Sequence, residues 1–147
     1  MDETTTYDDI LTSFITNCKV SRKLIPTNED ILKEWIQNGI KLYNNKMKKY
    51  EDDFNYPIMG DDVIESLDVK LTDDELLILI NIMKLVFLKN EKTLFVSKYG
   101  VFQKEFGINN YNAQANAKDL EITEQEKTID DLIVNALDDW SPYYENF

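Results

Sequence analysis

The stretch from Leu76 to Leu88 constrains the fold most, because it is apolar at every position except Asn81 and Lys84. If the stretch is helical, apolar side chains project on all sides, and such a helix is normally buried among other elements. It is too short to cross a bilayer, which requires about 20 apolar residues. The sequence therefore predicts a buried central segment rather than a membrane span.

A capping signal upstream favours a helix over a strand for this segment, which periodicity alone does not decide. Thr72 and Glu75 have the spacing of a capping box, in which each side chain accepts a hydrogen bond from the other residue's amide. Asp73 and Asp74 place negative charge at the positive end of the helix dipole. We therefore predict a central helix over residues 72–90.

Apolar periodicity predicts three further helices, over residues 7–18, 28–50 and 112–139. Gly39 lies on the inner face of the second, where it costs about 1 kcal/mol relative to Ala. A close helix crossing explains a small residue there. The last helix is either continuous or begins again at a second capping box over residues 123–126.

These elements predict a mainly α fold, a bundle of about four helices around a buried central helix, in one domain over residues 1–139. The connector over residues 54–71 is punctuated by proline and glycine, and its second half is either a short helix or a strand. Residues 93–107 are aromatic and β-branched, which predicts an irregular or β-like excursion after the central helix. That excursion either folds back on the core or contacts another protein.

Charge limits the partners of this chain. It has 16 Lys and Arg against 28 Asp and Glu, a formal net charge of −12 at pH 7. Such a field opposes the binding of DNA, RNA and anionic membranes. It suits a basic protein partner, or a channel through which DNA slides without adhering. The basic patch formed by Lys41, Lys46, Lys48 and Lys49 is interpreted as a solvated partner of a helix dipole, followed by an acidic run that neutralises it.

Residue types argue against catalysis and metal binding. The chain has no histidine, which removes the commonest general base and the commonest metal ligand. Cys18 is the single cysteine, so no internal disulfide and no thiolate metal cage forms, and we expect it to be buried. The acidic segment 61–68 lacks the glycine and glutamate spacing of an EF-hand. We expect no enzyme activity, no catalytic residue, no cofactor and no metal.

The last residues form an aromatic tail over positions 140–147. Pro142 stops the preceding helix, and Tyr143, Tyr144 and Phe147 follow it. The tail packs either on its own domain or on a neighbouring subunit, where aromatic side chains make good anchors. Together with the excursion, it supplies the candidate interface residues, namely Phe95, Tyr99, Phe102, Phe106, Trp140, Tyr143, Tyr144 and Phe147.

The segment from Leu71 to Leu88 begins Leu-Thr-Asp-Asp-Glu and leads into the apolar stretch with a late methionine. A less ordered stretch over 102–106 follows, and then a long alanine-containing C-terminal helix that includes residues 113–118 and 129–133. This order resembles the head-to-tail connector, or adaptor, proteins of the neck of tailed bacteriophages. The resemblance covers Leu71 to Asp139, about half of the chain.

The resemblance implies a structural virion protein in the neck that forms a homo-oligomeric ring, commonly of twelve copies, beneath the portal. It implies the portal and other neck or tail proteins as partners, and a lumen through which DNA passes without specific binding. No membrane is involved. The alternative is a small acidic cytoplasmic binding protein, such as an inhibitor that mimics DNA or a regulator.

Overall fold

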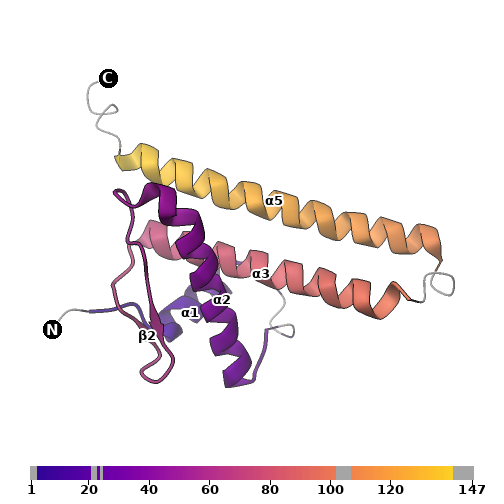
Figure 1. Ribbon diagram of the computed structural model, residues 1–147, viewed down its shortest axis with the longest axis horizontal. Coiled ribbons are helices and arrows are strands. Elements are labelled where there is room, and N and C mark those ends of the chain that lie inside the picture. The colour runs from indigo at the N-terminus through magenta and orange to yellow at the C-terminus, as the bar shows by residue number, and fades with distance from the viewer. Residues whose placement is uncertain (1–2, 21–22, 24, 102–106, 141–147) are drawn as a thin grey trace.

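The computed structural model describes residues 3–20, 23, 25–101 and 107–140, without the side chains of residues 108 and 138–140. The elements in chain order are α1 (Tyr7–Asn17), α2 (Glu29–Met47), a 3-10 helix η2 (Lys48–Tyr50), β1 (Gly60–Asp61), β2 (Ser66–Leu67), α3 (Asp73–Tyr99) and α5 (Ile108–Trp140). The long helices α3 and α5 run antiparallel, while α1, α2 and the small sheet gather beside the first half of α3 (Figure 1). The predicted mainly α class, with a buried central helix and a long C-terminal helix, is confirmed.

The start of the central helix is fixed by the predicted capping box. The Thr72 hydroxyl accepts from the Glu75 amide at 3.2 Å, and Glu75 Oε1 accepts from the Thr72 amide at 2.9 Å. Downstream, the apolar stretch is buried on several sides, with Leu79, Ile80 and Met83 fully buried. Helices α1, α2 and α5 all contact α3. The helix is therefore the centre of the core, as predicted.

Helix α2 crosses α3 at Gly39. A Cβ at this position would lie 2.6 Å from Cγ of Met83, closer than carbon atoms approach each other. Beside the crossing, the Trp35 indole N–H donates to the Met83 carbonyl at 2.9 Å. The Trp35 ring also meets Phe14 of α1 edge to face, at 4.7 Å between centroids. The expected need for a small residue at a close crossing is confirmed.

The N-terminal residues tie the connector to α1. Thr6 caps α1 in a capping box with Asp9. Just before it, the Thr5 amide donates to the Val69 carbonyl at 3.0 Å, and the Leu67 amide donates to the Thr5 carbonyl at 2.8 Å. Strands β1 and β2 pair antiparallel in the same region. The second half of the connector is thus a strand rather than a short helix.

Two predicted boundaries differ from the structure. The central helix continues past residue 90 to Tyr99, so the irregular or β-like excursion predicted from residue 93 is wrong for residues 93–99. Phe95 lies buried against α5, and this tertiary contact overrides the β propensity of the local sequence. The second capping box is absent, because the Thr123 hydroxyl donates to the Asp119 carbonyl at 3.0 Å within a continuous α5.

Candidate interaction surface

A groove of about 550 Å³ lies between the C-terminal end of α2, the middle of α3 and α5. Its floor is apolar and consists of Leu42 from α2 with Ile82 and Leu85 from α3. Ile82 and Leu85 are buried parts of the main core, so helices rather than loops form this part of the groove. We call it the lysine groove, for the side chains around its rim: Lys46, Lys48, Lys49 and Lys89.

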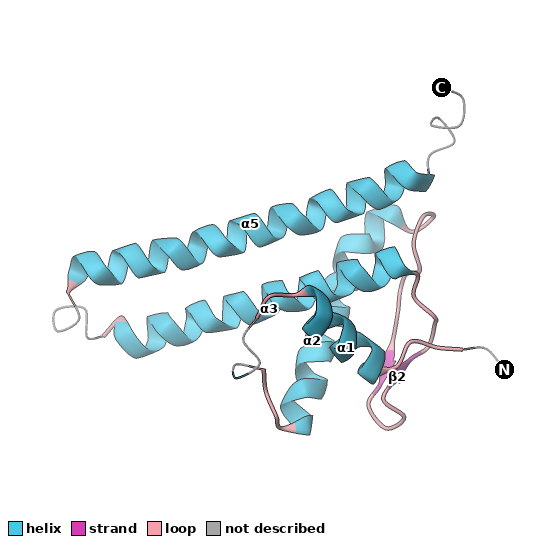
Figure 2. Ribbon diagram, turned by 180° about the vertical axis from the view of Figure 1, so that it is seen from behind, coloured by secondary structure: helices cyan, strands magenta, loops and turns pink. Residues whose placement is uncertain are grey.

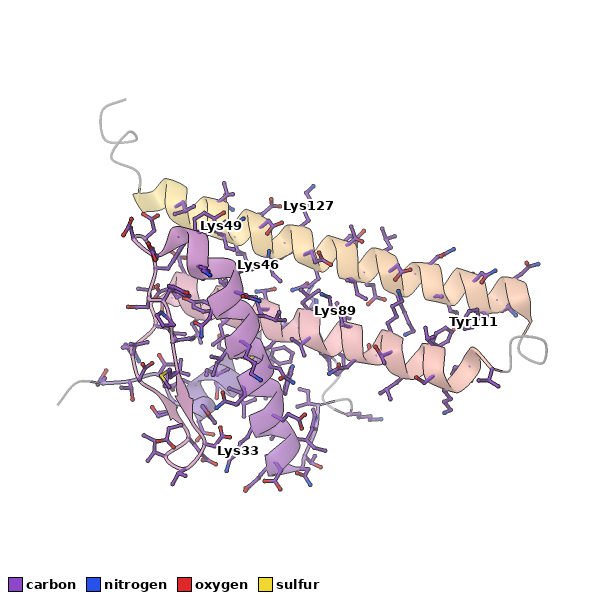
Figure 3. The ribbon with its side chains drawn as sticks, viewed as in Figure 1. Lys33, Lys46, Lys49, Lys89, Tyr111 and Lys127 are labelled. Atoms are coloured by element: carbon purple, nitrogen blue, oxygen red, sulfur yellow. The ribbon has the colours of Figure 1, made fainter. Side chains whose placement is uncertain are left out.

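The rim concentrates positive charge on a strongly acidic chain. Lys46 and Lys49 come from the end of α2 and from η2, whereas Lys89 comes from α3 (Figure 3). Among the described residues that line the groove, Glu126 of α5 is the one carboxylate. Lys46 also pairs with Asp130 of α5 at 2.7 Å, and this contact holds α2 against α5. The sequence predicted that Lys41, Lys46, Lys48 and Lys49 are solvated residues at a helix end. In the structure, the last three of these lysines surround the lysine groove, whereas Lys41 does not line it.

A second surface lies at the far end of the α3–α5 hairpin. We call residues 89–99 of α3 with residues 108–120 of α5 the distal arm. Inside it, the rings of Phe95 and Tyr111 stack with centroids 5.4 Å apart and planes inclined by 12°. Tyr99 lies 5.2 Å from Phe95, and the Lys118 ammonium lies over the Phe95 ring. These contacts hold the two helices of the arm together.

The predicted interface residues are distributed unevenly. Phe95 is buried and Tyr99 half-buried within the hairpin, so both contribute to packing of the arm. Trp140 ends α5, and its side chain lies outside the description. The other five also lie outside the described residues: Phe102, Phe106, Tyr143, Tyr144 and Phe147. Contact of these residues with another protein stays a prediction.

Aliphatic side chains are exposed on the outside of the same arm. Leu94 is 69% exposed on α3, and Leu120 is 59% exposed on α5. Lys92 and Asp119 form an ion pair between the two helices. The arm therefore places its aromatic residues Phe95 and Tyr111 inside and leaves Leu94 and Leu120 in solvent.

The groups with shifted pKa values make structural contacts. The Tyr7 hydroxyl donates to Asp62 at 2.6 Å, and Gln37 donates to the same carboxylate oxygen at 2.9 Å. Burial, reinforced by Asp62, raises the pKa of Tyr7 well above its usual range, while the hydrogen bonds from Gln37 and Tyr7 lower the pKa of Asp62. The cluster joins α1, α2 and the sheet, and it presents no activated nucleophile.

Cys18 lies at the end of α1, where it is buried as expected. Its Sγ approaches the Ile80 carbonyl at 3.8 Å, and burial raises the pKa of the thiol to about 11. The reactive thiolate is therefore scarce at neutral pH. Within the described residues, no three acidic or cysteine side chains are grouped to hold a metal ion. No helix of the described chain is long and apolar enough to span a membrane.

Comparison with known proteins identifies the family. A family model described as YomZ prophage protein matches residues 1–138, which include α1, α2, α3 and every residue of the lysine groove. The chain belongs to the YomZ prophage protein family. A curated relative, the SPbeta prophage-derived uncharacterized protein YomZ of Bacillus subtilis (strain 168), is 32% identical over 136 residues, or 92% of this chain and 98% of the relative. No solved structure matches the chain.

The YomZ family assignment confirms the phage origin that the resemblance to neck proteins implies. The family description names a prophage and gives no role in a connector. Sequence reasoning missed the lysine groove, because its walls come from α2, α3 and α5. The available signal was the cluster of lysines at 46–49. It also missed Tyr111, the ring on which Phe95 stacks.

Proposed function

We propose that this YomZ-family chain is a structural subunit of a phage particle, a head-to-tail connector that assembles as a ring beneath the portal. The distal arm carries this proposal. It projects past α1, α2 and the sheet as a hairpin of two helices (Figure 2). The partners of the protein are further copies of the chain, the portal and other neck or tail proteins. The protein acts in the neck of the virion and catalyses no reaction.

The arm has the surface of an element that is covered on assembly. Leu94 of α3 and Leu120 of α5 are mostly exposed in the single chain. Contact with a neighbouring copy would bury them. Removing apolar surface from water contributes roughly 25 cal/mol per Å². Repeated contacts of this kind between copies favour an oligomer over a monomer.

Charge also supports the connector proposal. A subunit of net charge −12 repeated around a ring gives an acidic lumen, which DNA traverses without adhering. A ring requires contacts between unlike patches on neighbouring copies. The exposed aliphatic side chains of the arm and the lysine groove are two separate surfaces of one acidic subunit, and each can contact a different surface of a neighbouring copy.

The proposal is tested by measuring the mass of the full chain, alone and mixed with the portal protein of the same phage, by mass photometry. We expect a ring-sized particle, formed by the chain alone or on the portal. Leu94→Glu should prevent it, because a charge replaces an exposed aliphatic side chain of the arm. Ile64→Glu is the matched control, since Ile64 is also 69% exposed but lies outside the arm. A chain that stays monomeric with its portal would overturn the proposal.

A second candidate is a small acidic binding protein that mimics DNA. It is favoured by the exposed carboxylates along α5, among them Glu121, Glu124 and Asp131. A monomeric chain that binds a basic DNA-binding protein, and is displaced by DNA, would support this candidate. Substituting these three carboxylates by amides should then weaken that binding, while the same substitutions should leave a connector ring intact.

A further inference from the structure

We propose that the lysine groove binds the acidic and aromatic segment 138–147 of a second copy of this chain. This inference rests on the self-assembly proposed above and assigns to it one specific contact. It joins the groove, which the structure defines, to a segment whose chemistry is read from the sequence. The contact is head-to-tail, because one copy supplies the groove and its neighbour supplies the segment.

The groove combines two properties that select the same kind of ligand. Its apolar lining combines the half-buried Leu42 with Ile82 and Leu85, which are almost fully buried, and a phosphate or another small inorganic anion does not use such a surface. Its rim carries four lysines, of which Lys46 is paired with Asp130, and one carboxylate among the described lining residues, Glu126, and an apolar ligand does not use such charges. A volume of about 550 Å³ accommodates a few large side chains. The chemistry therefore fits a peptide that carries both carboxylates and apolar rings.

The segment 138–147 has this composition. It contains the carboxylates of Asp138, Asp139 and Glu145 among four aromatic residues, Trp140, Tyr143, Tyr144 and Phe147. Carboxylates complement the lysines of the rim, and aromatic rings match the floor. Lysine ammonium groups also attract ring faces, as Lys49 already does over Tyr50 at 5.4 Å. Charge and apolar surface thus match between the two sites.

The path of α5 favours a contact between copies over one within a copy. The helix passes the groove at Asp130, which pairs with Lys46. It then continues to Trp140, a further rise of about 15 Å along its axis. Figure 1 shows α5 running on past the C-terminal end of α2, whose lysines line the groove. The segment therefore begins beyond the groove of its own copy, which favours its delivery to the groove of a neighbouring copy.

Two full-length variants test the contact. The groove variant carries Lys48→Glu and Lys49→Glu, and the tail variant carries Tyr143→Ala, Tyr144→Ala and Phe147→Ala. For each variant alone, we expect the dissociation constant of self-association, measured by mass photometry, to rise by roughly tenfold or more. In the groove variant, charge repulsion opposes the contact, and in the tail variant the aromatic anchors are missing. The control is Lys41→Glu with Lys127→Glu, which changes the charge equally. Lys41 does not line the groove, and Lys127 points away from it (Figure 3).

Mixing the two variants gives the decisive result. The tail variant keeps an intact groove and the groove variant keeps an intact tail, so an equimolar mixture should form dimers that neither variant forms alone. Helical circular dichroism should be unchanged in the groove variant, since Lys48 and Lys49 are exposed, and it is measured in the same way for the tail variant. Wild-type rings that persist in both variants would overturn the groove contact and leave the connector proposal standing. A mixture that stays monomeric would overturn the contact between copies. A wild-type chain that never associates, even with its portal, would overturn both proposals.

Discussion

The two halves of α3 lie in different surroundings although they form one helix. From Ile78 to Leu88, α3 is enclosed by α1, α2 and α5, and most of its side chains are buried. In the distal arm, Phe95 is the one buried side chain among the described residues of α3 beyond position 88. We call α1, α2, the sheet and residues 73–88 of α3 the base. The base is stabilised on several sides, whereas the arm is stabilised by a single helix–helix contact.

This difference predicts unequal stability within one domain. Regions with few buried apolar contacts open locally at a lower free energy than the core, and elements that change on binding are drawn from such regions. The base should therefore unfold only globally, and the arm should open by itself. The following substitutions test that contrast, from the largest expected effect to the smallest.

Met83→Ala should have the largest effect, because Met83 is fully buried where α2 crosses α3. Deleting such a side chain leaves a cavity and lowers the free energy of unfolding by about 2–5 kcal/mol. Urea denaturation followed by circular dichroism measures the loss. Leu94→Ala in the arm is the control, with an expected change within about 0.5 kcal/mol. Equal losses in the two variants would contradict the division into base and arm.

Glu75→Gln should lower the free energy of unfolding by about 1–3 kcal/mol. The carboxylate is 3% exposed and accepts from the Asn55 amide at 2.6 Å, the Asn55 side chain at 2.9 Å and the Thr72 amide at 2.9 Å. Both carboxylate oxygens of Glu75 accept hydrogen bonds, so the NH₂ group of a glutamine would face a donor N–H in either orientation. Glu121→Gln, on the exposed surface of α5, is the control and should be neutral in the same urea titration. An unchanged urea midpoint for Glu75→Gln would show that the hydrogen bonds of Glu75 do not stabilise the base.

Phe95→Ala should act locally. It removes the stack on Tyr111 and the contact with Tyr99, so the opening free energy of the arm should fall by roughly 0.5–3 kcal/mol. Hydrogen exchange measured by mass spectrometry should show faster exchange of peptides from residues 89–99 and 108–120. Peptides from α1 and α2 should exchange at the wild-type rate. Faster exchange throughout the chain would show that the arm and the base unfold together.

The Cys18 thiol should have the smallest effect and should report on opening of the base. Burial raises its pKa to about 11, so folding disfavours the thiolate. This contribution to stability is complete below the unfolded pKa of about 8.5 and is lost as the pH rises toward 11. At pH 8 the native chain should react slowly with a disulfide reagent, and the urea-unfolded chain should react fast. Met83→Ala should accelerate the native reaction and Phe95→Ala should not.

The base could be predicted from the sequence because its signals are local. The capping box at Thr72 and Glu75 is four residues long, and the burial of Ile78 to Leu88 follows from continuous apolarity. The α3 half of the arm could not be predicted beyond residue 90, since the stack of Phe95 on Tyr111 depends on how two helices meet. Without that contact, the β-branched and aromatic residues after position 93 indicate a strand or a loop.

The lysine groove shows the same limit. The lysines at positions 46–49 are visible in the sequence, but Lys89 and Glu126 join them only through the packing of α2 against α3 and α5. The charge pattern along α2 alone therefore predicted that these lysines are solvated residues at a helix end. The assignment of the site required the positions of residues distant in the chain.

Hydrogen exchange of the full chain, free and assembled with its portal, tests most directly whether the arm is the element of assembly. The connector account predicts that peptides from residues 89–99 and 108–120 gain protection in the assembled particle. Peptides from α1 and the first half of α2 should remain as protected as they are in the free chain. An arm that exchanges at the same rate in both states would contradict the account.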